Sequence, residues 1–469
     1  MLEFVIRPQA YPPKRAADAR ARDFREIAAP FAPESSADQA ARCSQCGVPY
    51  CAVHCPLHNH IPDWLRLAAE GRLREAYELS NATSTMPEIC GRICPQDRLC
   101  EGNCVIEFSG HGAVTIGAVE KFITDSAWEQ GWVAPLTPGA PTGQSIGIIG
   151  AGPAGLTAAE YLRAAGHDVH VYDRHDRAGG LLTYGIPGFK LEKPVVMRRI
   201  DRLAAAGIAF HQGFDVGRDA SLAELRARHA ALLIATGVYR AKDGAVPGSD
   251  AQGVVAALDY LIASNRADFG EALPATFDAA GKRVVVIGGG DTAMDCVRTA
   301  VRQGATSVQC LYRRDRANMP GSQREVANAE EEGVEFVWLA APARFEGDPV
   351  RAVHGRAMRL GSPDASGRRR AEPAPDGDFT LEADLVIQAL GFDPEDLPYA
   401  FGAAELRVTR WGTLIVEPAT MMTSLPGVFA AGDIVRGASL VVWAIRDGRD
   451  VAAKMNVWLA AQGPLERAA

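Results

Sequence analysis

The chain has 469 residues, of which 47% are hydrophobic and 23% charged, and it carries a formal net charge of −8. This composition excludes a largely disordered chain and a coiled coil, and the acidity argues against a basic face for nucleic acid. No apolar run approaches the roughly 20 residues of a membrane-spanning helix, so a membrane-spanning protein is excluded too. The length allows two to four domains.

The N-terminus and the cysteines indicate the compartment. Residues 1–8 have no basic stretch leading into an apolar core, so we expect no signal peptide and a cytoplasmic protein. Disulfides are rare in the cytosol, yet eight of the ten cysteines lie between Cys43 and Cys104. Such a cluster favours metal binding. Cys296 and Cys310 lie outside it, and we expect them to be buried core thiols.

The first region, residues 1–135, shows mostly helical patterns. Apolar and charged residues recur at helical spacing over 15–27 and 61–79, and both segments are predicted to be helices. A stretch rich in Pro, Gly and Thr follows, and residues 136–144 are predicted to be a linker.

The cysteines of this region form two groups with spacings typical of iron–sulfur ligands. The first group ends in a Cys-Pro step, as the bacterial ferredoxin run does, and eight thiolates suffice for two 4Fe–4S clusters. Zinc is the alternative, but only one C-x2-C pair has the usual zinc spacing. Spacing does not assign each cysteine to a cluster, although we expect Cys55 or Cys104 to cross between groups. The predicted metal ligands are Cys43, Cys46, Cys51, Cys55, Cys90, Cys94, Cys100 and Cys104.

From residue 145 onward, short β-branched runs alternate with Ala-rich helical segments. A strand, a glycine turn, a helix and a second strand follow one another twice, over residues 146–172 and 283–312. Repeated βαβ units predict parallel sheets and an α/β fold. The polar stretch 361–378 is expected to be an exposed hairpin or loop.

The first glycine motif, residues 150–155, comes directly after a strand and opens a helix. Gly150 allows the tight turn, Gly152 allows a pyrophosphate to approach the backbone, and Gly155 allows close packing of helix and strand. Asp173 ends the next strand, where an acid binds ribose hydroxyls. The motif therefore predicts dinucleotide binding.

The second motif also follows a strand, but Ala replaces its third glycine. The next strand ends in two arginines instead of an acid. An acid would repel a 2′-phosphate, whereas a guanidinium forms charge-assisted hydrogen bonds with it, so NADP(H) is predicted. The predicted contacts are Gly288, Gly290, Asp291, Thr292, Arg313 and Arg314.

Three further segments complete a recognisable set: apolar strands over 233–237 and 386–391, and a strand leading into a helix over 427–433. With both glycine motifs, residues 145–469 resemble the flavoproteins with two dinucleotide-binding domains, such as glutathione and thioredoxin reductases. The resemblance implies FAD at the first motif, with Gly237 nearby and Asp433 on the ribityl chain.

The same resemblance implies that one Rossmann-like domain is inserted in another. FAD would be bound by residues 145–240 and 385–469, and NADPH by residues 241–384. One feature departs from the disulfide reductases, because neither Cys296 nor Cys310 belongs to a redox Cys pair. Electrons from the flavin would therefore leave through the N-terminal cysteine region.

The whole chain is similar to the small (beta) subunits of bacterial NADPH-dependent glutamate synthases. Besides the cysteine groups, the matching segments are spread over nearly the whole chain, at residues 13–15, 22–27, 179–190, 312–315, 318–321 and 431–434. In related domains an oxygen side chain can replace one cysteine ligand, which makes Glu120 a candidate, although we expect an ordinary glutamate on a helix surface there. His54, His58 and His60 are expected to be surface or supporting groups.

The resemblance implies a partner, the large (alpha) subunit, which carries FMN and makes glutamate from glutamine and 2-oxoglutarate. NADPH would reduce FAD without a catalytic side chain, and the clusters would pass electrons to FMN. Gly180 and Leu181, in segment 179–189, would line the flavin. The alternatives are an electron-input subunit of the dihydropyrimidine dehydrogenase type, a ferredoxin:NADP oxidoreductase, or a nucleotide-binding scaffold without turnover.

Overall fold

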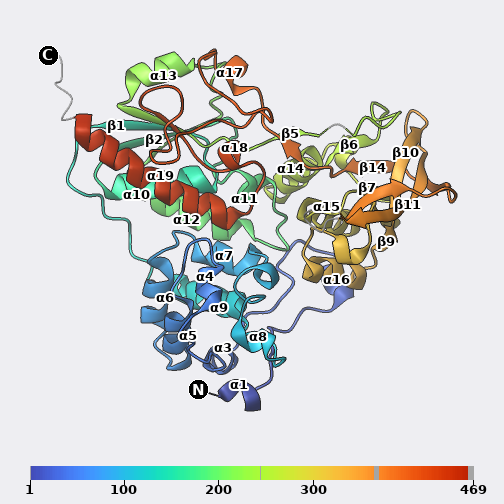
Figure 1. The fold of residues 1–469 in the computed structure, drawn as a ribbon, viewed down its shortest axis with the longest axis horizontal. Coiled ribbons are helices and arrows are strands. Elements are labelled where there is room, and N and C mark those ends of the chain that lie inside the picture. Colours follow the sequence, from blue (N-terminus) through green and yellow to red (C-terminus); the bar gives the residue numbers. More distant parts are fainter. Residues whose placement is uncertain (1, 243, 364–368, 463–469) are drawn as a thin grey trace.

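The computed structural model describes residues 2–242, 244–363 and 369–462. Figure 1 shows a helical N-terminal region, in blue, next to two α/β regions. No helix in the described ranges is long and apolar enough to span a membrane. The N-terminal region contains α1 (Glu3–Ile6), α2 (Ala17–Arg20), α3 (Pro33–Ala41), α4 (Tyr50–Val53), α5 (Ile61–Ala69), α6 (Leu73–Asn81), α7 (Pro87–Ile93), η1 (Gln96–Arg98), α8 (Val105–Phe108) and α9 (Ile116–Glu129).

Two helix predictions in this region were wrong in extent. Only Ala17–Arg20 of the segment 15–27 is helical, because Arg15 turns back to pair with Asp23 at 2.6 Å and to donate to nearby carbonyls. The segment 61–79 forms two helices instead of one. They are separated at Gly71, whose φ of +76° is a left-handed conformation that ends a helix.

The first sheet is parallel and has the strand order β16-β4-β1-β2-β3. Its strands are β1 (Ser145–Ile149), β2 (Asp168–Asp173), β3 (Ala209–Gln212), β4 (Ala231–Ile234) and β16 (Val428–Ala430). The accompanying helices are α10 (Pro153–Ala164), α11 (Leu181–Tyr184), α12 (Lys193–Ala205), α13 (Leu222–Arg228), α17 (Leu397–Ala400), α18 (Asp433–Arg436) and α19 (Val441–Gln462). Residues 130–144, all described, form no helix or strand.

The second sheet is also parallel, with the order β6-β14-β7-β8-β9. It consists of β6 (Val254–Ala256), β7 (Arg283–Ile287), β8 (Ser307–Tyr312), β9 (Glu335–Trp338) and β14 (Leu385–Gln388). Its helices are α14 (Ala257–Asp268), η2 (Ala275–Phe277), α15 (Asp291–Arg302), η3 (Arg316–Asn318) and α16 (Gln323–Glu331). The α/β prediction with two Rossmann-like units is thereby confirmed.

Residues 254–388 of the second sheet lie in sequence between β4 and β16 of the first. The chain leaves the first sheet through β5 (Arg240–Ala241) and returns through β15 (Phe392–Asp393), and these two strands pair antiparallel. An antiparallel sheet of β10 (Ala340–Glu346), β11 (Ala352–Pro363), β12 (Arg369–Pro373) and β13 (Phe379–Glu382) extends outward (Figure 1). β11 and β12 confirm the expected hairpin, of which residues 364–368 lie outside the described ranges.

A buried ion pair joins the N-terminal region to the first α/β unit. Glu88 in α7 and Arg199 in α12 are 0% and 1% exposed, and two hydrogen bonds of 2.9 Å link the guanidinium to the carboxylate. A second buried cluster joins Arg20 of α2 to Glu332, which also pairs with Arg298 and Arg302 of α15. These contacts hold three parts of the chain in one arrangement.

Replacing Arg199 with Met is expected to lower the free energy of unfolding by about 3–5 kcal/mol, because it leaves the Glu88 carboxylate buried without its partner. Urea unfolding followed by far-UV circular dichroism measures this loss. The double variant Glu88→Leu/Arg199→Met is the control, since it removes the stranded charge and is expected to recover most of the stability. Equal losses in the single and the double variant would contradict this explanation.

Candidate functional site

The first glycine loop has the geometry of a phosphate-binding turn. Gly150 has a φ of +108°, and a Cβ added to it would lie 2.4 Å from the carbonyl oxygen of Ala235. A Cβ on Gly155 would lie 2.0 Å from the carbonyl oxygen of Gly150, so helix and strand meet closely there. A Cβ on Gly152 would instead meet no atom within 4 Å. The loop is therefore tightly packed on its inner side and open above Gly152, at the N-terminus of α10.

The segment 179–181 lies directly on this loop. The Gly179 amide donates to the Ala151 carbonyl at 2.8 Å, and a Cβ on Gly180 would lie 2.8 Å from Gly152 Cα. Leu181 then begins α11 and is partly exposed. The structure thus brings together residues that are 28 positions or more apart in sequence, as the proposed flavin contacts at Gly180 and Leu181 require.

Asp173 and Asp433 lie at the carboxyl ends of the strands of the first sheet. Asp173 accepts hydrogen bonds from the amides of Ala151, at 2.7 Å, and His175, at 2.8 Å, so it also holds the glycine loop in place. Asp433 is the first residue of α18, and burial raises its pKa to about 6. In its ionised form it can accept a hydrogen bond.

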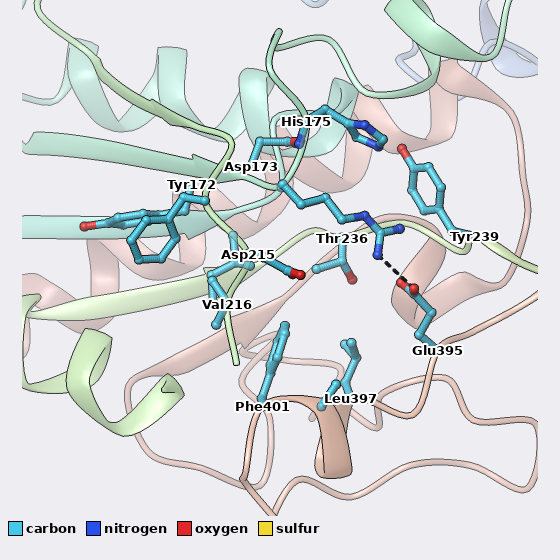
Figure 2. Close-up of a pocket in the computed structure, with 15 residues that line it drawn as sticks. Tyr172, Asp173, His175, Asp215, Val216, Thr236, Tyr239, Glu395, Leu397 and Phe401 are labelled. Carbon is cyan, nitrogen blue, oxygen red and sulfur yellow. Dashed lines mark hydrogen bonds and ion pairs between the residues drawn. The ribbon is translucent and has the colours of Figure 1, made fainter. Parts of the chain in front are cut away.

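An open pocket with an empty volume of about 600 Å³ lies at the ends of β1 and β2. Gly150, Asp173 and Thr236, the residue before Gly237, are part of its wall. Figure 2 shows His175 beside Tyr239 at one end, with their ring centroids 5.9 Å apart, and Leu397 with Phe401 at the other. Polar groups at the strand ends and an apolar far wall suit the adenosine part of a dinucleotide.

The second glycine loop repeats this geometry. Gly288 has a φ of +145°, and its added Cβ would lie 2.3 Å from the Ala389 carbonyl oxygen. A Cβ on Gly290 would meet no atom within 4 Å, so space is open at the N-terminus of α15. Asp291 and Thr292, both partly exposed, are the first two residues of that helix. Asp291 accepts a hydrogen bond of 2.9 Å from the Ser322 amide.

The two arginines after β8 differ in their surroundings. Arg313 is exposed, whereas Arg314 is only 9% exposed and its Nε donates to the Tyr312 hydroxyl at 3.0 Å. Both lie at the carboxyl end of β8, next to the glycine loop that follows β7. Arg313 is the more accessible of the two, and both arginines stay predicted contacts of a 2′-phosphate.

The eight N-terminal cysteines line two separate pockets. Cys43, Cys46, Cys51 and Cys104 line the first, and Cys55, Cys90, Cys94 and Cys100 line the second. Cys55 and Cys104, the residues expected to cross, thus each lie with the other sequence group. Each pocket presents four thiols around a space, which suits a polynuclear cluster. In the described ranges, no three His, Cys, Asp or Glu side chains converge on a point that could hold a single metal ion.

Polar groups support the first set of sulfurs. Gln45 Nε2 donates to Cys43 Sγ at 3.3 Å, and Ser44 Oγ lies 3.1 Å from Cys46 Sγ. Hydrogen bonds of this kind tune a cluster's reduction potential. Burial raises the pKa of Cys51 to about 12, so metal binding must drive the loss of its proton.

Glu120 is only 9% exposed, so the expectation of a helix-surface glutamate was wrong. It lines the second pocket, where its Oε1 accepts a hydrogen bond of 3.3 Å from Ser80. That pocket therefore offers five candidate ligands, its four cysteines and Glu120, to a cluster that takes four. His54, His58 and His60 are exposed and line neither pocket, as expected for surface groups. Cys296 and Cys310 are both 0% exposed within the core of the second sheet, which agrees with their prediction as core thiols.

Several pocket residues had no signal in the sequence. Glu395 closes the first-sheet pocket by pairing with Arg174 at 2.8 Å, and Tyr239 lies under the same guanidinium. Arg174 follows Asp173 directly and could have been suspected from that position. Glu395 and Tyr239 come from the two crossing segments between the sheets, and only the fold brings them together.

Two protein families match the chain. The family described as dihydropyrimidine dehydrogenase domain II, 4Fe-4S cluster, matches residues 20–132, and the pyridine nucleotide-disulphide oxidoreductase family matches residues 144–448. The N-terminal region is therefore a 4Fe–4S domain, and the remainder is a pyridine nucleotide oxidoreductase domain. The match to a 4Fe–4S domain argues against the alternative that these cysteines bind zinc.

Among solved structures, FprA of Mycobacterium tuberculosis in complex with NADPH is similar with a TM-score of 0.58 and 21% identity, over 69% of this chain and 85% of that one. A thioredoxin reductase of Lactococcus lactis matches 68% of this chain and 99% of that chain, with a TM-score of 0.50 and 21% identity. At these identities the likeness concerns the fold of the two α/β units.

Curated relatives cover nearly the whole chain. The glutamate synthase (NADPH) small chain of Azospirillum brasilense is 64% identical, over 98% of this chain and 97% of its own length. That of Escherichia coli K12 is 47% identical, over 97% and 98%. A putative oxidoreductase of the same organism, AegA, is 46% identical over 96% of this chain but only 69% of its own length. The chain therefore belongs to the family of glutamate synthase (NADPH) small chains and is an NADPH-dependent oxidoreductase.

Proposed function

We propose that this chain is the electron-input subunit of a glutamate synthase. It would oxidise NADPH through FAD and pass electrons through two 4Fe–4S clusters to the FMN of a large subunit, which forms glutamate from glutamine and 2-oxoglutarate. The proposal places the protein in the cytoplasm, where its thiols stay reduced. We assign FAD to residues 145–240 and 385–469, NADPH to residues 241–384, and the clusters to residues 1–135, with 136–144 as linker.

The arrangement of the two cysteine pockets is the observation that carries the proposal. The second pocket abuts the first α/β unit: Val442 of α19 lines it, and Cys90 belongs to the same apolar core as the strands of the first sheet. The first pocket lies within the helical core of the N-terminal region. Two carriers placed in this way would lead electrons from the first α/β unit into the core of the N-terminal region.

The residues of this chain bind and orient, and none is needed as a catalytic acid or base. FAD and the clusters supply the redox chemistry, which converts hydride transfer into single-electron steps. Gly152 and Gly290 leave room for the two diphosphates at the helix N-termini, where main-chain N–H groups favour anions. Asp173 would accept a hydrogen bond from the adenosine ribose of FAD, and Asp433 would orient the ribityl chain.

The surface outside the first pocket supports a protein acceptor. Five of the large hydrophobic side chains that are exposed lie in the two short segments flanking this pocket: Val48, Tyr50, Val53, Val105 and Phe108. Tyr50 and Val105 also line the pocket itself. An apolar patch around an electron carrier fits a docked redox partner, because it excludes water from the short path that electrons must cross.

A different acceptor is the second candidate. AegA has the same match over nearly this whole chain and is longer, so a similar module also occurs within larger oxidoreductases. Identity favours the first candidate, at 64% with a glutamate synthase small chain against 46% with AegA. An electron-input unit of the dihydropyrimidine dehydrogenase type and a ferredoxin:NADP oxidoreductase are further candidates of this kind, because they too would differ in the electron acceptor.

Anaerobic titration of the purified, FAD-loaded chain with NADPH tests the core of the proposal. We expect flavin absorbance to bleach, with iron and acid-labile sulfide matching two clusters. A large subunit of glutamate synthase, glutamine and 2-oxoglutarate are then added. Glutamate formed in proportion to the NADPH consumed supports the assignment. Flavin reduction without glutamate formation would show that the chain does not donate electrons to this large subunit and would favour another acceptor.

Replacing Arg313 with Met is expected to reduce the preference for NADPH over NADH by about 10- to 100-fold, because a charge-assisted hydrogen bond to phosphate is worth about 1.5–3 kcal/mol. Steady-state kcat/KM for both nucleotides, with a dye as acceptor, measures the change. Arg316→Met is the matched control, since Arg316 is also exposed but pairs with Glu330. An equal loss for both nucleotides would contradict the 2′-phosphate assignment.

A further inference from the structure

One side chain of the N-terminal region contacts the residue that directly follows the second glycine loop. Arg98 ends η1, between Cys94 and Cys100. Its Nη1 donates to the Pro320 carbonyl at 2.7 Å, and its Nη2 lies 3.3 Å from Asp291 Oδ2. The 4Fe–4S domain therefore touches the first residue of the helix whose N-terminus we assign to the diphosphate of NADPH.

Asp291 creates an electrostatic problem at that position. A carboxylate at the start of α15 is favourable for the helix, but it lies close to the N–H groups that a dinucleotide diphosphate would use. Its Oδ1 is held by the Ser322 amide, so the side chain is not free to turn away. A dinucleotide with two phosphate charges would be repelled unless a cation offsets this carboxylate.

We infer that Arg98 completes the NADPH site by neutralising Asp291, so that the 4Fe–4S domain contributes a positioning residue to the nucleotide site of another domain. This inference rests on the proposed function, because it requires NADPH at the second glycine loop. Arg98 has five N–H donors, of which the contacts given above use two, and its side chain is 43% exposed.

The segment carrying Arg98 is held from both sides. Glu101, three residues later, is buried, and it accepts hydrogen bonds from Arg324 at 2.5 Å, from the Tyr11 hydroxyl at 2.8 Å and from the Gly117 amide at 3.0 Å. Arg324 belongs to α16, which begins directly after Ser322. The segment is thereby fixed against the elements around the nucleotide, and Arg98 is oriented before the nucleotide arrives.

Stability alone does not explain this contact. Both partners are well exposed, at 43% and 39%, and exposed ion pairs contribute about 0–1 kcal/mol to folding. Both explanations therefore predict a small effect of Arg98 on stability, but only a role in nucleotide binding predicts a large effect on nucleotide affinity.

The experiment compares Arg98→Met and Arg98→Lys in the full FAD- and cluster-loaded chain. We expect Arg98→Met to weaken NADP⁺ and NAD⁺ alike by about tenfold, which is about 1.4 kcal/mol, since both share the diphosphate. Binding is followed by the perturbation of flavin absorbance. KM should rise with kcat nearly unchanged, FAD and iron contents should stay constant, and Arg98→Lys should restore most of the affinity.

A double-mutant cycle tests the mechanism. Neutralisation predicts that the double variant Asp291→Asn/Arg98→Met regains nearly wild-type affinity, because the carboxylate and the cation that offsets it are both removed. A double variant that binds as weakly as Arg98→Met alone would overturn the neutralisation of Asp291. Unchanged affinities in Arg98→Met, or a loss confined to NADP⁺, would overturn the role of Arg98. If the wild-type, FAD-loaded chain failed to bind NADP⁺, the proposed function itself would fail, so the two failures are distinguishable.

Discussion

Replacing Cys104 with Ser is expected to remove about half of the iron and sulfide, because one of two four-iron clusters loses a thiolate ligand. Cys104 lies in the pocket of Cys43, Cys46 and Cys51, so the cluster nearer the exposed apolar surface would be lost. Reduction of FAD by NADPH should persist, while electron transfer to the large subunit should fall to background. Iron and sulfide analysis, electron paramagnetic resonance and stopped-flow flavin absorbance give the three measurements.

Two further variants make this result specific. Cys100→Ser should remove the other cluster and interrupt transfer next to the flavin unit, because Cys100 lines the second pocket. Cys310→Ala is the matched control: this thiol is also buried, but it lies in β8 of the second sheet, and all iron should remain. Loss of all iron in Cys104→Ser, with retained folding, would contradict two separate clusters.

The variants Gly152→Ala and Gly290→Ala are expected to separate the two dinucleotide sites. Gly152→Ala should weaken FAD binding by about 10- to 100-fold, because a methyl group in a closely packed contact costs about 1–3 kcal/mol. The protein itself should tolerate both changes. The φ values are −77° and −92°, and each added Cβ has no neighbour within 4 Å.

Each glycine variant is the control for the other. Gly290→Ala should retain FAD and lose affinity for NADPH and NADH alike, since the diphosphate is common to both. The flavin content after purification and the Kd for NADP⁺ measure the two effects. The midpoint temperature of thermal unfolding without nucleotide should be unchanged or slightly higher for both variants, because alanine restricts the unfolded chain. Loss of FAD in both variants would contradict the assignment of one loop to each dinucleotide.

Local patterns in the sequence were sufficient for the strands and turns of the α/β part. The structure contains the strands predicted over 283–287 and 307–312 as β7 and β8, and the glycine turn predicted after the first strand leads into α15. Their conformation depends on neighbouring residues, such as the β-branched runs and the φ of +145° at Gly288. The helix predicted over 15–27 forms only in part, because the pairing of Arg15 with Asp23 outweighs the helical pattern of the segment.

The sequence by itself determined the chemistry available to this protein: eight clustered thiols, two glycine turns after strands, and an acid after one unit against two arginines after the other. Only the tertiary structure decided which groups act together. It sorted Cys55 and Cys104 into the pockets of the opposite groups, and it brought Arg98 to Asp291 across 193 positions of sequence. The physical reason is that turns follow from neighbours in the chain, whereas pockets follow from the packing of whole helices and sheets against each other.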